Sequence, residues 1–570
     1  MHKLIIIFTV LIAGSMLHAE TLSGQDAEGS LLPEIDPQDI EIRSQYRARF
    51  PGLRRQPILG FSPGSRVYQV DPERSPFLED RADIAAQLPV GELSRPEAPE
   101  YRAFPYADSR SGYGRFGAGN FVTPEAELYL NREIAPDQWL SGSVNHTSSA
   151  GHLDQNSSFR YLDAESRYRG KIGDRTVLGV SAGAQSDFNY LPLLEIGTPG
   201  AEVDPGRKSY TAVNAATRLQ RYQNSIEHLD IGLSTYYNTI GLDEEFFGLT
   251  SDLSEWGVAS DAGYTWAGER IDETYRLGTE IQAGGYELNG GGNESWHQAG
   301  LRGAYQRLFN YQTKLSASLG MYHIGDAADN TSLYVSPDIT VEHYPSDYLT
   351  ISANIRGKPE QLSHLDYHSE NRFLLPDNRL MHAYNLKAIA EVIIEPIAGN
   401  KIRTGISYQN SNNYPVFMRR DPVTGIGSAE GHYSLGYEDV TIQQVFAGMS
   451  VDLIRERLWF DVEGYFQAPR ISDDRQVPFE ETYRLSGAVT VRPVDRLLFE
   501  AWGNLTGPRE TYESRELDPF LTLGTKLELR LTDRIGAYGK ILNLLSQEYE
   551  IWEGYNERPF QVYGGITISL

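Results

Sequence analysis

The stretch LTLGTKLELRL at residues 521–531 decides the fold class. Leucine occupies positions 521, 523, 527, 529 and 531, whereas Thr522, Lys526, Glu528 and Arg530 stand between the leucines. Because a β-strand directs successive side chains to opposite faces, the stretch predicts a strand with one apolar face and one charged face.

The same alternation recurs to the end of the chain, for example at 458–467, 483–492 and 560–570. Short polar turns separate the alternating segments at intervals that leave room for two strands and one longer connection. The turns lie at 135–137, 173–175, 223–225, 268–270, 309–311, 345–347, 398–400, 455–457, 494–496 and 532–534. Ten turns join twenty strands, and a first strand near 112–121 and a last strand ending at Leu570 bring the expected number to about 22, within a range of 18–24.

Two all-β architectures fit this pattern, a soluble sandwich and a membrane barrel. The connections at the other end of the strands are long and polar, as at 191–207, 360–378 and 414–437. Short turns at one end and long loops at the other are typical of bacterial outer-membrane barrels, in which closure pairs every backbone group. We therefore expect a transmembrane antiparallel β-barrel over 112–570 in the outer membrane of a Gram-negative bacterium, with apolar faces towards lipid and charged faces towards the lumen.

Aromatic residues are abundant, with 35 Tyr, 7 Trp and 21 Phe. Tyrosine and tryptophan form girdles at both membrane interfaces of such barrels. Candidates near turns and strand ends are Trp139, Tyr190, Tyr236, Tyr237, Tyr344, Tyr348 and Trp552.

The overall composition excludes several classes of protein. The chain has no cysteine, which excludes a disulfide scaffold, a cysteine zinc site and a lipoprotein anchor. The formal net charge of −26 argues against nucleic acid as a partner, because that affinity depends on Lys and Arg neutralising phosphates.

The first nineteen residues have the features of a secretory signal. Lys3 precedes an apolar run from Leu4 to Leu17, and Ala19 is a small residue at the expected cleavage point. The alternative is a retained anchor, although the run is short for a membrane span.

Residues 20–111 are expected to form a proline-rich arm. They contain eleven of the 29 prolines and sustain no apolar period, and proline at this density prevents helices and central strands. We expect the arm to fill the barrel lumen, anchored by Phe61, Tyr68 and Phe104; the alternative is a disordered linker.

The C-terminal segment Tyr563-x-Gly565-x-x-Ile568-x-Leu570 resembles the terminal strand that the outer-membrane assembly machinery recognises. That signal prefers an aromatic last residue, so Leu570 is a departure. The preceding run at 540–550, followed by Gly554-Tyr555 and Pro559, resembles the closing hairpin of TonB-dependent receptors. The segment Gly112-Tyr113-Gly114-Arg115-Phe116 is similar to receptor-like barrels that lack a conventional plug domain.

The resemblance covers about residues 112–570 and implies passage of a solute across the outer membrane. It also implies contact with outer-membrane lipid, with the assembly machinery and with a periplasmic energy-coupling or partner protein. The alternative is a structural or assembly barrel whose arm binds a periplasmic partner.

Little in the sequence indicates catalysis, and we expect no enzyme activity, no cofactor and no catalytic or metal-binding residues. The strongest contrary signal is the cluster His364, Asp366, His368 and Glu370. In an extended segment these side chains share one face and suit a transition metal; the alternative is solvated loop residues.

Overall fold

The computed structural model describes twelve segments of the chain. They are residues 111–153, 157–191, 206–242, 252–270, 272–288, 292–310, 312–326, 331–376, 378–397, 399–419, 432–455 and 457–570. The predicted signal peptide, residues 20–110 of the predicted arm and the anchors Phe61, Tyr68 and Phe104 lie outside these residues.

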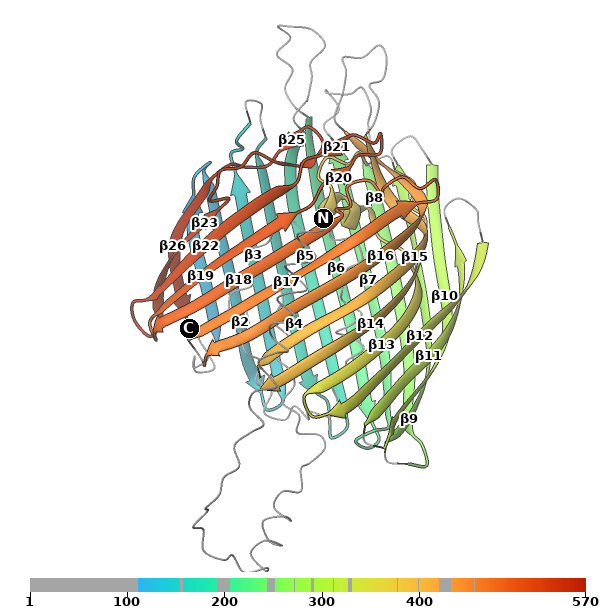
Figure 1. Ribbon diagram of the computed structural model, residues 1–570. Coiled ribbons are helices and arrows are strands. Elements are labelled where there is room, and N and C mark those ends of the chain that lie inside the picture. The colour runs from blue at the N-terminus through green and yellow to red at the C-terminus, as the bar shows by residue number, and fades with distance from the viewer. Residues whose placement is uncertain are drawn as a thin grey trace, which may run out of the picture. The chain divides into compact units, whose positions relative to one another are not determined.

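Most of the described chain forms one large sheet of 22 antiparallel strands (Figure 1). Its first half comprises β1 (Gly112–Gly119), β2 (Thr123–Ala135), β3 (Gln138–Ser149), β4 (Phe159–Lys171), β5 (Thr176–Leu191), β6 (Gly206–Tyr222), β7 (His228–Leu242), β8 (Leu253–Ala267), β9 (Glu273–Leu288), β10 (Gly292–Phe309) and β11 (Thr313–Gly325). Its second half comprises β12 (Thr331–Ser346), β13 (Leu349–Glu360), β14 (Ala383–Ile397), β15 (Asn400–Arg419), β16 (Tyr433–Ile454), β17 (Leu458–Ile471), β18 (Tyr483–Val494), β19 (Leu497–Thr506), β22 (Phe520–Arg530), β23 (Ile535–Leu542) and β26 (Gln561–Ser569).

The remaining elements are short and lie in the connections. They are the helix α4 (His364–Glu370) and the paired strands β20 (Arg509–Glu510) with β21 (Glu516–Leu517) and β24 (Glu550–Trp552) with β25 (Tyr555–Asn556). Among the described residues, no helix is both long and apolar enough to cross a membrane.

The sheet closes on itself between its first and last strands. β1 pairs with β2 on one side and with β26 on the other, from Tyr113 opposite Ser569 to Gly119 opposite Tyr563. The predicted barrel of about 22 strands is confirmed, and the sandwich alternative is wrong because a sandwich leaves its sheet edges unpaired.

Each of the ten predicted turns connects two neighbouring strands of the barrel, from β2–β3 to β22–β23. Both ends of the barrel sheet lie at the same end of the barrel as these turns, since Ser569 N–H donates to the carbonyl of Arg534 in the β22–β23 turn at 2.8 Å and Ser111 N–H donates to the carbonyl of Leu570 at 2.9 Å. By the rule for such barrels, the short turns face the periplasm and the longer connections face the exterior. In Figure 1 the labelled short strands of the longer connections, β20, β21 and β25, lie at the opposite end of the barrel from the C-terminus.

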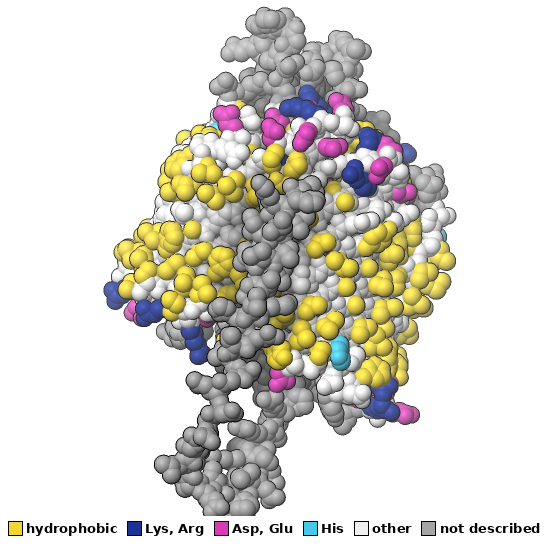
Figure 2. Space-filling view, viewed as in Figure 1, with side chains coloured by type: hydrophobic (Ala, Val, Ile, Leu, Met, Phe, Trp, Pro, Cys, Tyr) yellow, Lys and Arg dark blue, Asp and Glu magenta, His cyan; other side chains and the backbone are white. Residues whose placement is uncertain are grey.

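The outer wall is apolar and the lumen wall is polar. On β9, Leu277 and Ile281 project outwards, with Ile281 58% exposed, whereas the alternate residue Arg276 forms an ion pair with the buried Asp230 of β7. The leucines of 521–531 likewise lie outside, while Lys526 and Glu528 are buried on the inner face. Figure 2 shows hydrophobic side chains over the middle of the visible wall and charged side chains near its two ends.

The aromatic prediction is confirmed for some residues and wrong for others. Tyr237 lies on the outer face, but Tyr236 points into the lumen and Trp552 is buried in an extracellular connection. An aromatic row that was not predicted lies on the outer face beside the β8–β9 turn, with neighbouring ring centroids 5.2–6.0 Å apart; it consists of Tyr264, Trp266, Tyr275 and Tyr305.

Candidate functional site

The extracellular mouth of the barrel is covered by its own connections, which we call the cap. The cap consists of residues 361–382, which include α4, together with the hairpins β20–β21 and β24–β25. Its side chains and those of the wall share one apolar core of buried residues. The cap members of that core are Tyr367, Phe373, Leu374, Leu375, Leu380, Leu517, Ile551, Trp552 and Tyr555.

Aromatic contacts hold the parts of the cap together. Phe373 and Tyr555 stack with ring centroids 3.5 Å apart, and Trp552 lies 4.8 Å from Phe479 and 4.9 Å from Phe417. The buried Arg509 donates to the carbonyl of Ile551 at 3.0 Å and so ties the two hairpins together. Since each fully buried large apolar side chain contributes about 1.5–3 kcal/mol, this core makes the closed cap a defined structure.

The segment that carries the cluster His364, Asp366, His368 and Glu370 is a helix rather than an extended segment. Ser363 caps α4, because its hydroxyl accepts from the backbone of Asp366 and the Asp366 carboxylate accepts from the backbone of Ser363. This reciprocal pair is a capping box, a local signal that favours a helix. His364 and His368 are buried, whereas Asp366 is exposed and bonds to Ser363. No group of three candidate metal ligands exists among the described residues.

Glu255 of β8 fixes the start of α4. Its side chain is fully buried, and its Oε2 accepts from the backbone N–H of His364 at 2.9 Å. Its Oε1 accepts from the Tyr236 hydroxyl at 3.1 Å. A carboxylate at a helix N-terminus satisfies an N–H group that has no partner inside the helix.

Lys208 of β6 fixes the other side of the same segment. Its side chain is fully buried, and its Nζ donates to the carbonyl of Leu374 at 2.7 Å and lies 3.0 Å from His368 Nδ1. The Tyr210 ring lies 5.2 Å away. Among the described residues no carboxylate pairs with Lys208, so its charge is compensated only by a carbonyl, an imidazole and an aromatic face.

Further contacts extend this attachment across the mouth. The Tyr286 hydroxyl of β9 accepts from Leu380 N–H, and the Tyr437 hydroxyl of β16 accepts from Met381 N–H, both at 3.1 Å. Strands β6 and β16 are ten positions apart in a ring of 22. The segment 361–382 is therefore attached to nearly opposite sides of the wall, and we call Glu255 and Lys208 its latch residues.

Below the cap, ion pairs line the lumen. Asp230 lies 3.5 Å from Arg276 and 3.9 Å from Arg218, and Lys358 lies 3.3 Å from Glu280. Because both signs of charge are present, the inner wall suits polar solutes and water rather than an apolar ligand.

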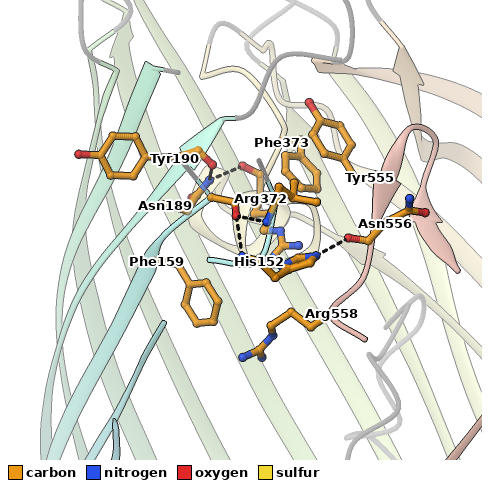
Figure 3. A pocket seen from close by; sticks show the side chains of 11 residues that line it. His152, Phe159, Asn189, Tyr190, Arg372, Phe373, Tyr555, Asn556 and Arg558 are labelled. Carbon is orange, nitrogen blue, oxygen red and sulfur yellow. Dashed lines mark hydrogen bonds between the residues drawn. The ribbon is translucent and has the colours of Figure 1, made fainter. Parts of the chain in front are cut away.

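A small cavity lies where the cap meets the wall (Figure 3). Arg372 and Phe373 of the cap, Arg558 of the closing connection and Asn189 of β5 line it. Asn189 donates to the carbonyl of Arg372 at 3.2 Å, and His152 Nε2 donates to the carbonyl of Asn556 at 2.9 Å. Its volume of about 20 Å³ suits one water molecule.

The predicted site residues fall in different places. Phe61, Tyr68 and Phe104 lie outside the described residues, so their proposed anchoring stays a prediction. The assembly-signal residues lie on β26 or directly after it: Tyr563 faces the lumen, Ile568 pairs with Gly114 of β1, and Leu570 projects outwards. Gly565 lies under Tyr538, where an added Cβ would collide with the carbonyl oxygen of Phe116.

The latch residues were not predicted. Alternation along GRKSY at 206–210 puts Lys208 on the inner face, but its burial depends on a loop from residues more than 150 positions away. The one local signal was Ser363 with Asp366, which predicts the start of α4.

Comparison with solved structures shows the same barrel in receptors of low sequence identity. The siderophore receptor PirA from Pseudomonas aeruginosa is 11% identical, with 80% of this chain and 79% of that chain covered and a TM-score of 0.58. The ferric yersiniabactin uptake receptor FyuA from Yersinia pestis is 10% identical, with 80% of both chains covered and a TM-score of 0.62. The FrpB iron transporter from Neisseria meningitidis is 10% identical, with 81% and 82% covered and a TM-score of 0.63.

The chain has the barrel fold of outer-membrane siderophore and metal receptors. The fold that the resemblance to TonB-dependent receptors implied is thus confirmed. No protein-family model and no curated protein matches the sequence. With its apolar outer wall and its asymmetric connections, the barrel is an outer-membrane protein of a Gram-negative bacterium.

Proposed function

We propose that this protein admits a polar solute across the outer membrane through the barrel lumen, and that the cap is the extracellular gate. The observation that carries the proposal is the cap itself, which Glu255 and Lys208 attach to one side of a charged lumen and Tyr437 attaches to the other. The fold is shared with receptors named for siderophore, yersiniabactin and iron uptake, which supports a transport role.

The latch is suited to release as well as to closure. A buried cation without a carboxylate partner raises the free energy of the closed state, because the ammonium has lost its hydration. Lifting residues 361–382 exposes Lys208 to water and recovers that hydration. The apolar core stabilises the closed cap, and the cost of burying the charge keeps the free-energy difference between the closed and the open state small.

The arm is the second part of the proposal. The described chain enters β1 from the periplasmic end, so residues 20–111 join the barrel where they can reach either the lumen or the periplasm. We propose that the arm occupies the lumen through Phe61, Tyr68 and Phe104, and that a periplasmic energy-coupling or partner protein displaces it.

Swelling of liposomes that contain an impermeant dextran and are diluted into isotonic sucrose tests both parts. Four proteins are compared: the full chain, the chain without residues 22–105, and each of these with Glu255→Ala. We expect slow swelling for the full chain and at least tenfold faster swelling when the deletion and Glu255→Ala are combined. The substitution leaves the His364 N–H and the Tyr236 hydroxyl without their acceptor, at about 1–3 kcal/mol each.

The matched control is Glu342→Ala, which removes a lumen carboxylate that pairs with Lys314 far from the cap. It should swell at the rate of its parent. If the combined variant folds into vesicles and swells no faster than the full chain, the barrel is not a passage, and the structural or assembly role takes its place.

A further inference from the structure

A group of side chains on the outer wall has no role in the lumen or the cap. Arg160 of β4, Phe188 and Tyr190 of β5, and Arg207 of β6 lie next to one another across three adjacent strands, and we call them the rim patch. Their strands form the blue-green part of the wall in Figure 1.

Alternation shows that the rim patch faces outwards. Phe159, Asp187, Asn189 and Lys208 are buried on the inner face, and the patch residues are their immediate neighbours along the strands. Val180 of β5 and Val213 of β6 are exposed on the outer face, and each lies an even number of residues from the patch residues of its own strand. In Figure 3 the Tyr190 ring points away from the cavity and from the cap.

The two arginines enclose one aromatic ring. The guanidinium carbon of Arg160 lies 5.1 Å from the Phe188 ring centroid, and that of Arg207 lies 4.5 Å from it. Tyr190 meets Phe188 edge-on with ring centroids 6.3 Å apart. A planar guanidinium stacked on an aromatic face keeps its N–H donors in a fixed direction. This orientation favours binding of an anion through two parallel hydrogen bonds.

Neither arginine is neutralised within the part of the chain that the structure describes. Arg115, Arg218, Arg276 and Arg302 on the lumen wall each form an ion pair with a carboxylate. Arg160 and Arg207 form none with a described residue, and the buried Nε of Arg160 has no hydrogen-bond partner. The patch therefore carries two positive charges in a chain whose formal net charge is −26.

The position of the patch on the wall indicates what it contacts. Arg160 is the second residue of β4 and Arg207 is the second residue of β6, at the extracellular ends of both strands. Val180 and Val213 lie further along the strands towards the periplasm, within the apolar wall. The arginines thus lie at the height of lipid headgroups in the outer leaflet, where aromatic residues of barrels also gather.

We propose that the rim patch binds the phosphate groups of an anionic lipid of the outer leaflet, of the lipid A type. Each guanidinium donates to phosphate oxygens, while Phe188 and Tyr190 contact the acyl and sugar parts beside them. A free phosphate ion offers the same oxygens but none of this apolar contact, and the outward direction of the patch favours the lipid.

Native mass spectrometry of the detergent-solubilised full chain tests the proposal. The probes are lipid A with both phosphates and the same lipid with both phosphates removed. We expect the bisphosphorylated lipid to bind at least tenfold more tightly than the dephosphorylated lipid. Inorganic phosphate at millimolar concentration should not displace it; displacement would identify a general anion site and overturn the assignment to lipid.

The variant Arg160→Gln/Arg207→Gln should lose most of this preference for phosphate. Its matched control is Arg167→Gln/Arg169→Gln, which removes the same charge from the inner face of β4 and should bind like the parent. Equal binding of both lipids by the parent protein overturns the proposal without any variant. If the parent prefers the bisphosphorylated lipid and Arg160→Gln/Arg207→Gln keeps that preference, the phosphates bind elsewhere and the proposal is overturned.

Discussion

At the scale of single residues, His368 makes the stability of the closed cap depend on pH. Its ring lies between Lys208 and Tyr210 of the wall, with His364 on the same helix. Burial, with the Lys208 ammonium and His364 as further causes, holds the pKa of His368 well below its ordinary value of 6.5. The closed cap therefore contains a neutral imidazole.

The sign of the pH effect follows from this shift. A released cap binds a proton near pH 6.5, whereas the closed cap does so only at lower pH, so closure is fully stable above 6.5 and weakens as the pH falls. The free energy that stabilises the closed cap falls by at most about 1.4 kcal/mol per pH unit. We expect hydrogen exchange of residues 361–382, corrected for intrinsic rates, to become faster at about pH 5.5 than at about pH 7.5.

The control for this pH effect is His368→Gln, which cannot be protonated. Its exchange in the cap should depend much less on pH than that of the parent. An equal pH dependence in both proteins would show that other groups release the cap.

The sequence predicted which face a residue occupies but not how deeply it is buried. Alternation along 521–531 correctly separated the outward leucines from the inward Lys526 and Glu528. It gave no indication that Lys208 loses all contact with water, because that burial is produced by a loop from a remote part of the chain.

At the scale of elements, the seam between β1 and β26 depends on close backbone approach. The Tyr538 ring covers Gly565, and an added Cβ there would also lie 2.7 Å from Gly117 Cα. Backbone atoms cannot move aside as a side chain can, so we expect Gly565→Ala to destabilise the barrel by about 1–3 kcal/mol. The midpoint of denaturant unfolding in micelles measures the change.

Gly564 is the matched control for this substitution. It is the preceding residue of β26, and an added Cβ there would lie 3.9 Å from the carbonyl oxygen of Tyr538, an ordinary van der Waals contact. Gly564→Ala should leave the midpoint nearly unchanged. Equal effects at both positions would mean that general strand propensity, rather than packing at the seam, decides the result.

The middle of β9 tests which face meets lipid. Ile281 is 58% exposed on the outer wall, whereas the next residue, Gln282, donates to Glu280 inside the lumen. Ile281→Arg should cost about 2–4 kcal/mol in a bilayer, as charged residues do near the midplane of barrel walls. Gln282→Arg places the same side chain beside a carboxylate and should cost little; a larger loss at 282 would reverse the assigned faces.

Turns were the elements that the sequence predicted best. Each predicted turn combines polar residues with a break in the alternation, and both signals are local. The connection 360–378 was predicted as a long polar loop, in which the alternating histidines and acids would share one face if the segment were extended, but the capping box at Ser363 and Asp366 favours a helix there.

At the scale of the whole molecule, closure followed from the number of strands and from the physics of the bilayer. An even number of antiparallel strands returns both ends of the sheet to one side, and hydrocarbon leaves no sheet edge unpaired. The cap could not be predicted from the sequence, because its apolar residues are scattered over several connections. They form a common core only when the barrel brings those connections together.

The central claim is that solute passes through the lumen when the cap lifts, and a reversible cross-link tests it most directly. The chain has no cysteine, so Lys208→Cys/His368→Cys introduces a unique pair that a short cleavable bis-thiosulfonate reagent can join. The pair is placed in the chain without residues 22–105, and single-channel conductance is recorded in a planar bilayer before and after reduction. We predict low conductance while the link is intact and a stepwise rise when it is cleaved; unchanged conductance after cleavage, verified by mass spectrometry, would contradict the claim.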